Sequence, residues 1–258
     1  MIRFLRADLR RLARSRTFML AVLAMLLLAA ALMWMQATAM DYTVPLSRVV
    51  FLPLSFYGVV MAASISCFAG ADFADGFIRN KLIAAGSRRE VVLSHVLTAC
   101  VACVGIYGVT TLLSLGVGCF FFKNDMSAGA FAGFFLLGMG MSLSVACLFC
   151  IVTLLCADRT RAVVVCMGIA FAMLFLCLHT NQQLVQTELK DGAPNPHYVG
   201  GVRRALYGVL HDLNPCGQAA QLSSWKTWSP ARMIVCDLLW TAGVPALGCA
   251  AFDGKDIR

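Results

Sequence analysis

Six long apolar runs constrain the fold of this chain more than any other feature. A helix needs about 20 apolar residues to cross a hydrocarbon layer about 30 Å thick. The runs are Thr17–Gln36, Val49–Gly70, Val91–Phe122, Met126–Cys156, Ala162–Leu178 and Met233–Phe252. A soluble fold could not hide so much apolar surface, because 60% of the 258 residues are hydrophobic and only 13% are charged, against about 25% charged in soluble domains.

The secondary structure of these runs follows from their solvent. Lipid offers no hydrogen-bond partners, so a spanning segment must be a helix or part of a closed barrel, and the runs lack the alternation of barrel strands. We therefore predict an all-α, polytopic membrane protein with six transmembrane helices, forming a single transmembrane domain over residues 1–258. The same features exclude a secreted disulfide scaffold and a nucleic-acid-binding protein.

Cysteine usage also favours a membrane interior. Eleven of the 12 cysteines lie in the runs or at their ends. The Cys100-x-x-Cys103 and Cys147-x-x-Cys150 pairs lie in apolar helices, where cysteine behaves as a small hydrophobic residue. We therefore expect no metal site and no disulfide. A second interpretation, an outer metal site, rests on four side chains outside the runs: His179, His197, His211 and Cys216.

The placement of Lys and Arg predicts the orientation. Fourteen of the 21 basic residues fall before the first run, between the second and third, between the fourth and fifth, or after the sixth. Basic residues are retained on the cytoplasmic side, so both termini are predicted to be cytoplasmic. The first run follows 16 residues that contain six arginines, which favours an uncleaved signal anchor over a cleaved signal peptide.

The segment Met1–Arg16 has the pattern of an amphipathic helix at the membrane surface. Its apolar residues recur at helical spacing, and arginines occupy the other faces. Such a helix can enter the headgroup boundary while its arginines meet anionic lipid or an acidic protein. The alternative is a topology signal with no further role. The apolar stripe consists of Ile2, Leu5, Leu9 and Leu12.

The cytoplasmic loop Ala71–Glu90 contains the signals of a second short helix. Asp75 can cap its start, and Gly86 suits the left-handed position after its end. Ser87 and Glu90 then form a capping box that begins the third span. The pattern predicts a helix over Gly76–Ala85 whose exposed polar side chains meet a partner: Arg79, Asn80 and Lys81.

This loop carries a family resemblance. The stretch Asp75-Gly76-Phe77-Ile78-Arg79-Asn80-Lys81-Leu82, followed by Gly86-Ser87-Arg88, resembles the inner loop of type-2 ABC exporter permeases, which are six-span bacterial membrane subunits. The layout is similar over the whole chain, including the basic amphipathic N-terminus. It also includes a long outer segment with Asn214-Pro215-Cys216-Gly217-Gln218 before the last span.

The resemblance implies a mechanism and a set of partners. In that family the loop carries a coupling helix that docks on a separate ABC ATPase subunit, and two permease copies or two similar permeases enclose the path. It implies residence in the bacterial inner membrane among lipid, no cofactor in this chain, and ATP with Mg²⁺ on the ATPase. The implied ATPase-coupling positions are Asp75, Gly76, Arg79, Asn80, Lys81 and Arg88.

The motifs of ATP hydrolysis and of membrane enzymes are missing from the sequence. It has no Gly-x-x-x-x-Gly-Lys-Ser/Thr phosphate loop, no His-Glu-x-x-His zinc helix and no Gly-x-Ser-x-Gly nucleophile elbow. We therefore expect a transport subunit without catalytic residues, and a separate chain that hydrolyses ATP. A membrane-embedded enzyme and a non-transporting immunity or sensor subunit are the alternatives.

The spans themselves are nearly free of charge, which favours an amphipathic or hydrophobic substrate. Asp237 in the last span is the exception. We expect it to pair helices, with Arg203 or Arg204 as its partner, or to line the substrate path. In the outer segment His179–Arg232, the apolar spacing predicts an amphipathic helix over Val202–Leu213 that ends at Pro215. Four span glycines are expected to permit close helix packing: Gly105, Gly108, Gly138 and Gly140.

Overall fold

The computed structural model describes residues 2–39, 44–84, 87–190 and 193–253. Within them, six helical segments are long and apolar enough to cross a membrane, which confirms the predicted all-α fold class and the number of spans. These segments are Arg16–Ala39, Ser47–Ala74, Arg88–Phe121, Ala128–Cys156, Arg159–Val185 and Pro230–Phe252.

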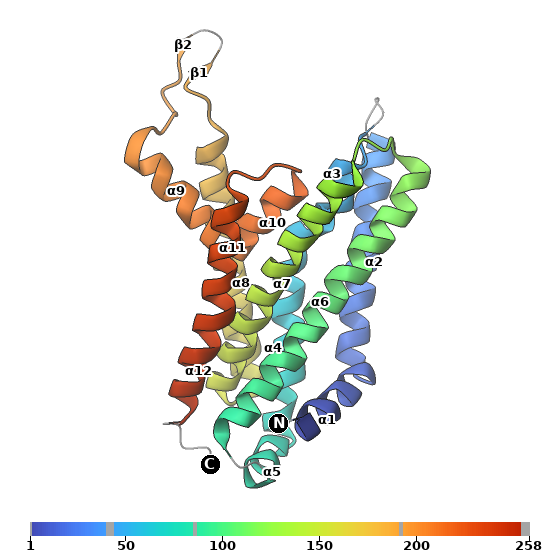
Figure 1. Ribbon diagram of the computed structural model, residues 1–258, viewed down its shortest axis with the longest axis vertical. Coiled ribbons are helices and arrows are strands. Elements are labelled where there is room, and N and C mark those ends of the chain that lie inside the picture. Colours follow the sequence, from blue (N-terminus) through green and yellow to red (C-terminus); the bar gives the residue numbers. More distant parts are fainter. Residues whose placement is uncertain (1, 40–43, 85–86, 191–192, 254–258) are drawn as a thin grey trace.

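The elements follow one another in a simple order along the chain (Figure 1). They are α1 (Ile2–Ala13), α2 (Arg16–Ala39), α3 (Ser47–Val50), the 3₁₀ turn η1 (Leu52–Phe56), α4 (Tyr57–Ala74), α5 (Phe77–Ala84), α6 (Arg88–Phe121), α7 (Ala128–Cys156), α8 (Arg159–Val185), the two-residue strands β1 (Leu189–Lys190) and β2 (Ala193–Pro194), α9 (Gly201–Leu213), α10 (Pro215–Ser223), α11 (Pro230–Leu238), the π-helical turn η2 (Leu239–Gly243) and α12 (Val244–Asp253).

Three of the spans form the centre of the bundle. In the spans that contain α4, α6 and α7, between 50% and 61% of the residues in the apolar stretch are buried inside the protein. In α2, α8 and the last span, the buried share is 22% to 28%. The peripheral helices therefore present most of their apolar side chains outward, as helices surrounded by lipid must. α6, with 34 residues, is about 50 Å long at 1.5 Å per residue, so it extends beyond the hydrocarbon layer.

Tyrosines and small residues hold the central helices together. The hydroxyl of Tyr57 on α4 donates to the carbonyl of Cys103 on α6 at 2.8 Å. Tyr107, also on α6, donates to the carbonyl of Phe135 on α7 at 3.1 Å and lies against Gly138, where a Cβ would collide with its ring. Gly138 therefore packs closely, as predicted. Gly105 and Gly108 have no neighbour within the described chain that a Cβ would meet, so they do not pack closely against another helix of the same chain.

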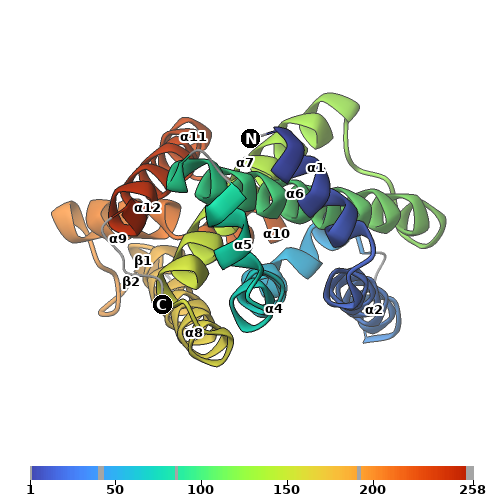
Figure 2. The ribbon, with the colours of Figure 1, turned by 90° about the horizontal axis from the view of Figure 1, so that it is seen from below.

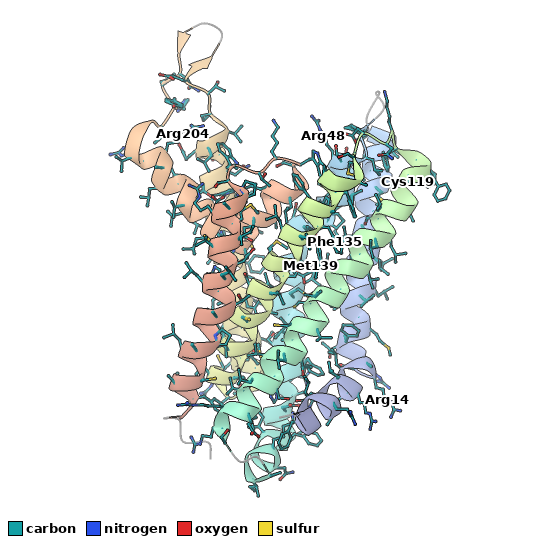
Figure 3. The ribbon with its side chains drawn as sticks, viewed as in Figure 1. Arg14, Arg48, Cys119, Phe135, Met139 and Arg204 are labelled. Atoms are coloured by element: carbon teal, nitrogen blue, oxygen red, sulfur yellow. The ribbon has the colours of Figure 1, made fainter. Side chains whose placement is uncertain are left out.

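The two ends of the bundle differ in structure. α1, α5 and the end of α12 lie at one end, which we call the α5 end, and α3, α9, α10 and the β1–β2 hairpin lie at the other, which we call the α9 end (Figure 1). Figure 3 shows Arg14 at the α5 end and Arg48 and Arg204 at the α9 end, with Phe135 and Met139 of α7 between them. The labelled charges thus flank an apolar middle.

The outer segment contains one helix more than the sequence predicted. α9 occupies the predicted range and ends before Pro215, but Pro215 also begins α10, whose first turn Asn214 caps by accepting from the Cys216 backbone N–H at 3.0 Å. Proline favours the first position of a helix because it has no N–H to leave unsatisfied. α10 is largely buried and packs against η1, α7 and α8, so Cys216 is enclosed by protein.

Candidate functional site at the α5 end

The N-terminal helix α1 lies across α6 at the α5 end of the bundle (Figure 2). Its predicted amphipathic pattern is confirmed, since Leu12 is buried and Arg6 and Arg10 are exposed. Asp8 is also buried, at 2% exposure. It follows Leu5 by three positions and precedes Leu12 by four, which places its carboxylate on the packed stripe of the helix.

Lys81 of α5 meets that carboxylate. Its Nζ donates to Asp8 Oδ1 at 2.6 Å and to Asp72 Oδ2, at the end of α4, at 3.0 Å. Ser94 of α6 donates to the other oxygen of Asp8 at 2.9 Å. Burial lowers the pKa of Lys81 from its ordinary value, while the adjacent Asp8 opposes that shift. One ammonium group thereby connects α1, α4 and α5.

Arg11 of α1 forms the second link. Its Nη2 donates to Asp72 Oδ2 at 2.9 Å, its Nη1 is ion-paired with Asp72 Oδ1, and its guanidinium lies 4.6 Å from the ring centre of Phe68 on α4. Burial lowers the pKa of Arg11, against the opposing charge of Asp8. The Asp72 side chain is fully buried. The two cations that pair with it, Arg11 of α1 and Lys81 of α5, both come from helices outside the spans.

His95 of α6 completes the cluster. Its Nδ1 lies 2.9 Å from the carbonyl of Val91, which can only accept, so Nδ1 carries a proton. Its Nε2 faces Asp72 Oδ2 at 2.8 Å and Lys81 Nζ at 3.4 Å. A charged ring donates to Asp72, and a neutral ring accepts from Lys81, so His95 has a partner in either protonation state.

These six side chains, Asp8, Arg11, Asp72, Lys81, Ser94 and His95, are called the ionic cluster below. Its two carboxylates match the charges of Lys81 and Arg11. Removing one partner from a buried ion pair costs about 3–5 kcal/mol because a charge is left unpaired. The cluster therefore ties α1 and α5 to the ends of α4 and α6.

The face of α5 opposite Ile78 and Lys81 points away from the bundle. Phe77 is 48% exposed and Ile83 is 80% exposed, and Asn80 lies exposed between them. Ile78, on the inner face with Lys81, is buried. Exposed apolar side chains on a short helix at the end of a bundle are typical of a surface that another protein covers. We call Phe77, Asn80 and Ile83 the outer face of α5.

The predicted coupling residues separate into three groups in the structure. Asp75 and Gly76 form the turn between α4 and α5, where Gly76 has a φ of +69°, a value that glycine adopts without strain. Asp75 directly follows the last residue of α4. Its backbone N–H donates to the carbonyl of Ala71 at 2.9 Å, and that of Gly76 donates to the carbonyl of Phe73 at 3.2 Å, so the helix ends there. Asn80 lies on the outer face of α5.

Lys81 and Arg88 do not reach that face. The expectation that Lys81 is exposed to a partner is wrong, because its side chain is only 15% exposed and lies within the ionic cluster. Arg88 begins α6, and its Nη1 donates to the carbonyl of Phe252 at the end of α12 at 3.4 Å. Arg79 lies in α5, but its side chain is outside the described part of the structure. Gly86 as a whole lies outside the described residues. The predicted cap from Ser87 is confirmed, since its hydroxyl accepts from the Glu90 N–H.

Asp237 does not have the partner that the sequence suggested. Its Oδ1 accepts from the Ser144 hydroxyl of α7 at 2.8 Å, so it pairs helices, but not through Arg203 or Arg204. Arg204 instead donates to the carbonyls of Leu184 and Gln186. The ion pair in this region joins Arg232 to Asp212 of α9, which also accepts from Gln221 at 2.6 Å.

The candidate outer metal ligands do not converge. His211 faces the Thr180 hydroxyl at 2.9 Å, and His179 packs edge-on against Tyr207. Among the residues that the structure describes, no group of three or more His, Cys, Asp or Glu side chains could hold a metal ion.

Sequence reasoning missed the acidic half of the ionic cluster and its α6 members. Asp8 is the one acidic residue in a segment with six arginines, and it falls on the apolar stripe, which is a signal that the residue is buried and paired. Asp72 and His95 gave a weaker signal, because each lies near the end of a span where polar residues are common.

Comparison with known proteins gives no relative. No protein-family model matches the chain, and no curated protein sequence matches it. Its function must therefore be inferred from the arrangement of its own side chains.

Proposed function

We propose that this chain is the membrane-spanning subunit of an ATP-driven exporter in a bacterial inner membrane, and that a separate ABC ATPase supplies the energy. It works with a second copy of itself or with a similar permease. The substrate is amphipathic or hydrophobic. The α5 end is cytoplasmic, in agreement with the 14 basic residues that the sequence assigns to that side.

One observation carries the proposal. α5 presents an exposed face with Phe77 and Ile83 outward, while Lys81 on its inner side is bonded to Asp8 and Asp72. A partner that moves α5 must therefore also move α1 and the ends of α4 and α6. A helix that is held on one side and free on the other is suited to transmit the motion of an ATPase into the spans.

The outer face of α5 is more apolar than the polar and charged contact that the sequence predicts. Lys81 is an internal anchor, so the contact with the ATPase is made by an apolar pair around the Asn80 amide. The ATPase surface that receives it is accordingly an apolar cleft with at least one hydrogen-bonding group.

The experiment replaces both apolar residues of the outer face, as Phe77→Asp with Ile83→Asp. Tagged protein is purified from the membranes of its own host, and copurifying proteins with a phosphate-loop sequence are quantified by mass spectrometry. Burial of one large apolar side chain contributes about 1.5–3 kcal/mol, so recovery of the ATPase should fall at least tenfold. Export and ATP hydrolysis by the complex should fall with it.

A matched control introduces the same charges at the α9 end. Val202→Asp with Leu206→Asp changes two exposed apolar residues of α9, at 86% and 55% exposure, and should leave ATPase recovery unchanged. If the unaltered chain brings down no phosphate-loop ATPase, the proposal is wrong. If the α5 variant retains the ATPase and normal export, α5 is not the coupling element.

A further inference from the structure

A second feature, far from α5, is a groove between α7 and α11, which lie side by side (Figures 1 and 2). Its volume is about 610 Å³, within the range of sites for small organic molecules. Aliphatic and aromatic side chains and glycines make up most of its wall, including Phe134, Leu137, Ile234 and Leu238. The groove also contains one carboxylate, that of Asp237.

Asp237 has few partners for a carboxylate in such surroundings. The residue is 6% exposed, and its Oδ1 accepts from Ser144 at 2.8 Å. Its other oxygen lies over Gly140, where a Cβ would collide with it, so glycine is needed to admit the carboxylate. In the described ranges, no Lys, Arg or His forms an ion pair with Asp237, and the nearby Arg232 is engaged by Asp212.

The environment of Asp237 contrasts with that of the other buried carboxylates. Asp8, Asp72 and Asp212 are each ion-paired with Lys81, Arg11 or Arg232. A buried carboxylate without a counter-ion is costly, because desolvation is not offset by an opposite charge. Asp237 is therefore the place in the spans where a positive charge from outside the protein would be stabilised most.

We propose that this groove is a binding site for an amphipathic organic cation, whose ammonium group pairs with Asp237 and whose apolar body lies along Phe134, Leu137 and Ile234. Charge complementarity selects the cation, and the apolar wall selects the attached body. Phe134 is held in place by stacking on Trp225, with ring centres 4.0 Å apart, so the wall next to the carboxylate is preorganised. The site belongs to the isolated chain and does not depend on a partner ATPase.

The test measures equilibrium binding of radiolabelled tetraphenylphosphonium, a lipophilic cation, to the purified full chain in detergent. Asp237→Asn keeps the shape of the side chain and removes its charge, and should weaken binding at least tenfold. Leu137→Trp keeps the charge and fills the groove, and should also weaken binding. Asp125→Asn removes an exposed carboxylate at the α9 end and should leave the affinity unchanged.

A second measurement uses only the unaltered protein, so its result does not depend on whether a variant folds. Dodecylamine should displace the probe from the unaltered protein, whereas uncharged dodecanol at the same concentration should not. Equal affinity in Asp237→Asn, or equal displacement by the alcohol, would overturn the proposal and leave an apolar groove without charge selectivity. A change in oligomeric state in Leu137→Trp with normal probe binding would also overturn it, because the groove would then be a contact between copies.

Discussion

At the scale of single residues, the buried carboxylates and His211 differ in how completely they are paired. Asp8 accepts from an ammonium group and a hydroxyl, Asp212 from a guanidinium and an amide, and Asp237 from the Ser144 hydroxyl without an ion pair among the described residues. His211 of α9 is the clearest case of incomplete pairing. The Thr180 hydroxyl that it contacts also donates to the carbonyl of Leu176, so His211 Nδ1 donates to that hydroxyl and Nε2 is left buried without a partner.

His211 predicts a pH dependence of stability. Burial lowers its pKa from the ordinary value of 6.5, against the opposing charge of Asp212. The unfolded state therefore binds more protons than the folded state just below pH 6.5, so stability should be lost as the pH falls through that value. The slope is at most about 1.4 kcal/mol per pH unit for one group.

The measurement is the melting temperature of the purified chain in detergent between pH 7.5 and 5.5. His211→Asn keeps a donor toward Thr180 but does not titrate, so its melting temperature should depend less on pH over this range. An identical pH profile in the variant would show that another group is responsible.

At the scale of elements, the ionic cluster makes α1 and α5 one mechanical unit. Asp8→Asn leaves Lys81 with Asp72, whereas Lys81→Met leaves Asp8 with the Ser94 hydroxyl only. We expect both variants to lower the free energy that holds α1 on the bundle. Lys81→Met should lower it more strongly, by up to about 3–5 kcal/mol. The double variant should be less affected than the sum of the two, because the paired charges are removed together.

Hydrogen–deuterium exchange of the α1 amides in the purified chain measures this loosening. Asp125→Asn, which changes an exposed carboxylate at the α9 end, serves as the control and should leave exchange unchanged. Strictly additive effects of the two substitutions would mean that Asp8 and Lys81 do not form a functional pair.

The elements also differ in how far the sequence could predict them. The spans were predictable because an apolar run of that length has few other solutions in lipid. The inward position of Lys81 was not, because a helix of eight residues is too short for its apolar spacing to choose between the 77/80 face and the 78/81 face. α10 was missed because Pro215 was interpreted only as the end of α9, and the spatial partners of Asp8 and Asp237 depend on packing between distant segments.

At the scale of the whole molecule, the two ends have different tasks under the proposed function. The α5 end holds the ionic cluster and the outer face of α5. At the α9 end, α9, α10 and α11 are joined through Asp212, which binds Gln221 and Arg232. A hollow of about 940 Å³ lies there, and Arg48, Arg204 and Lys226 are among its lining residues. Under the proposed function, the distribution of basic residues predicts that the α5 end is cytoplasmic.

The orientation is tested with cysteines that are introduced one at a time at exposed positions. Ser87→Cys at the α5 end and Lys226→Cys at the α9 end are introduced after the exposed Cys119 has been changed to serine. In intact cells, a membrane-impermeant maleimide should label position 226 and not position 87, and both should be labelled after the membrane is opened. Labelling of both in intact cells would contradict six spans with a cytoplasmic α5.

The ionic cluster also dictates an order of biogenesis. α1 precedes α4, α5 and α6 in the chain, and the side chains that bind Asp8 and Arg11 stand at positions 72, 81 and 94. Until position 72 has been synthesised, the two residues have none of these partners, and the set is complete only after Ser94, near the start of the third span, has followed. α1 is thus synthesised before the side chains that hold it, and we expect it to dock only after α4, α5 and the start of α6 are in place.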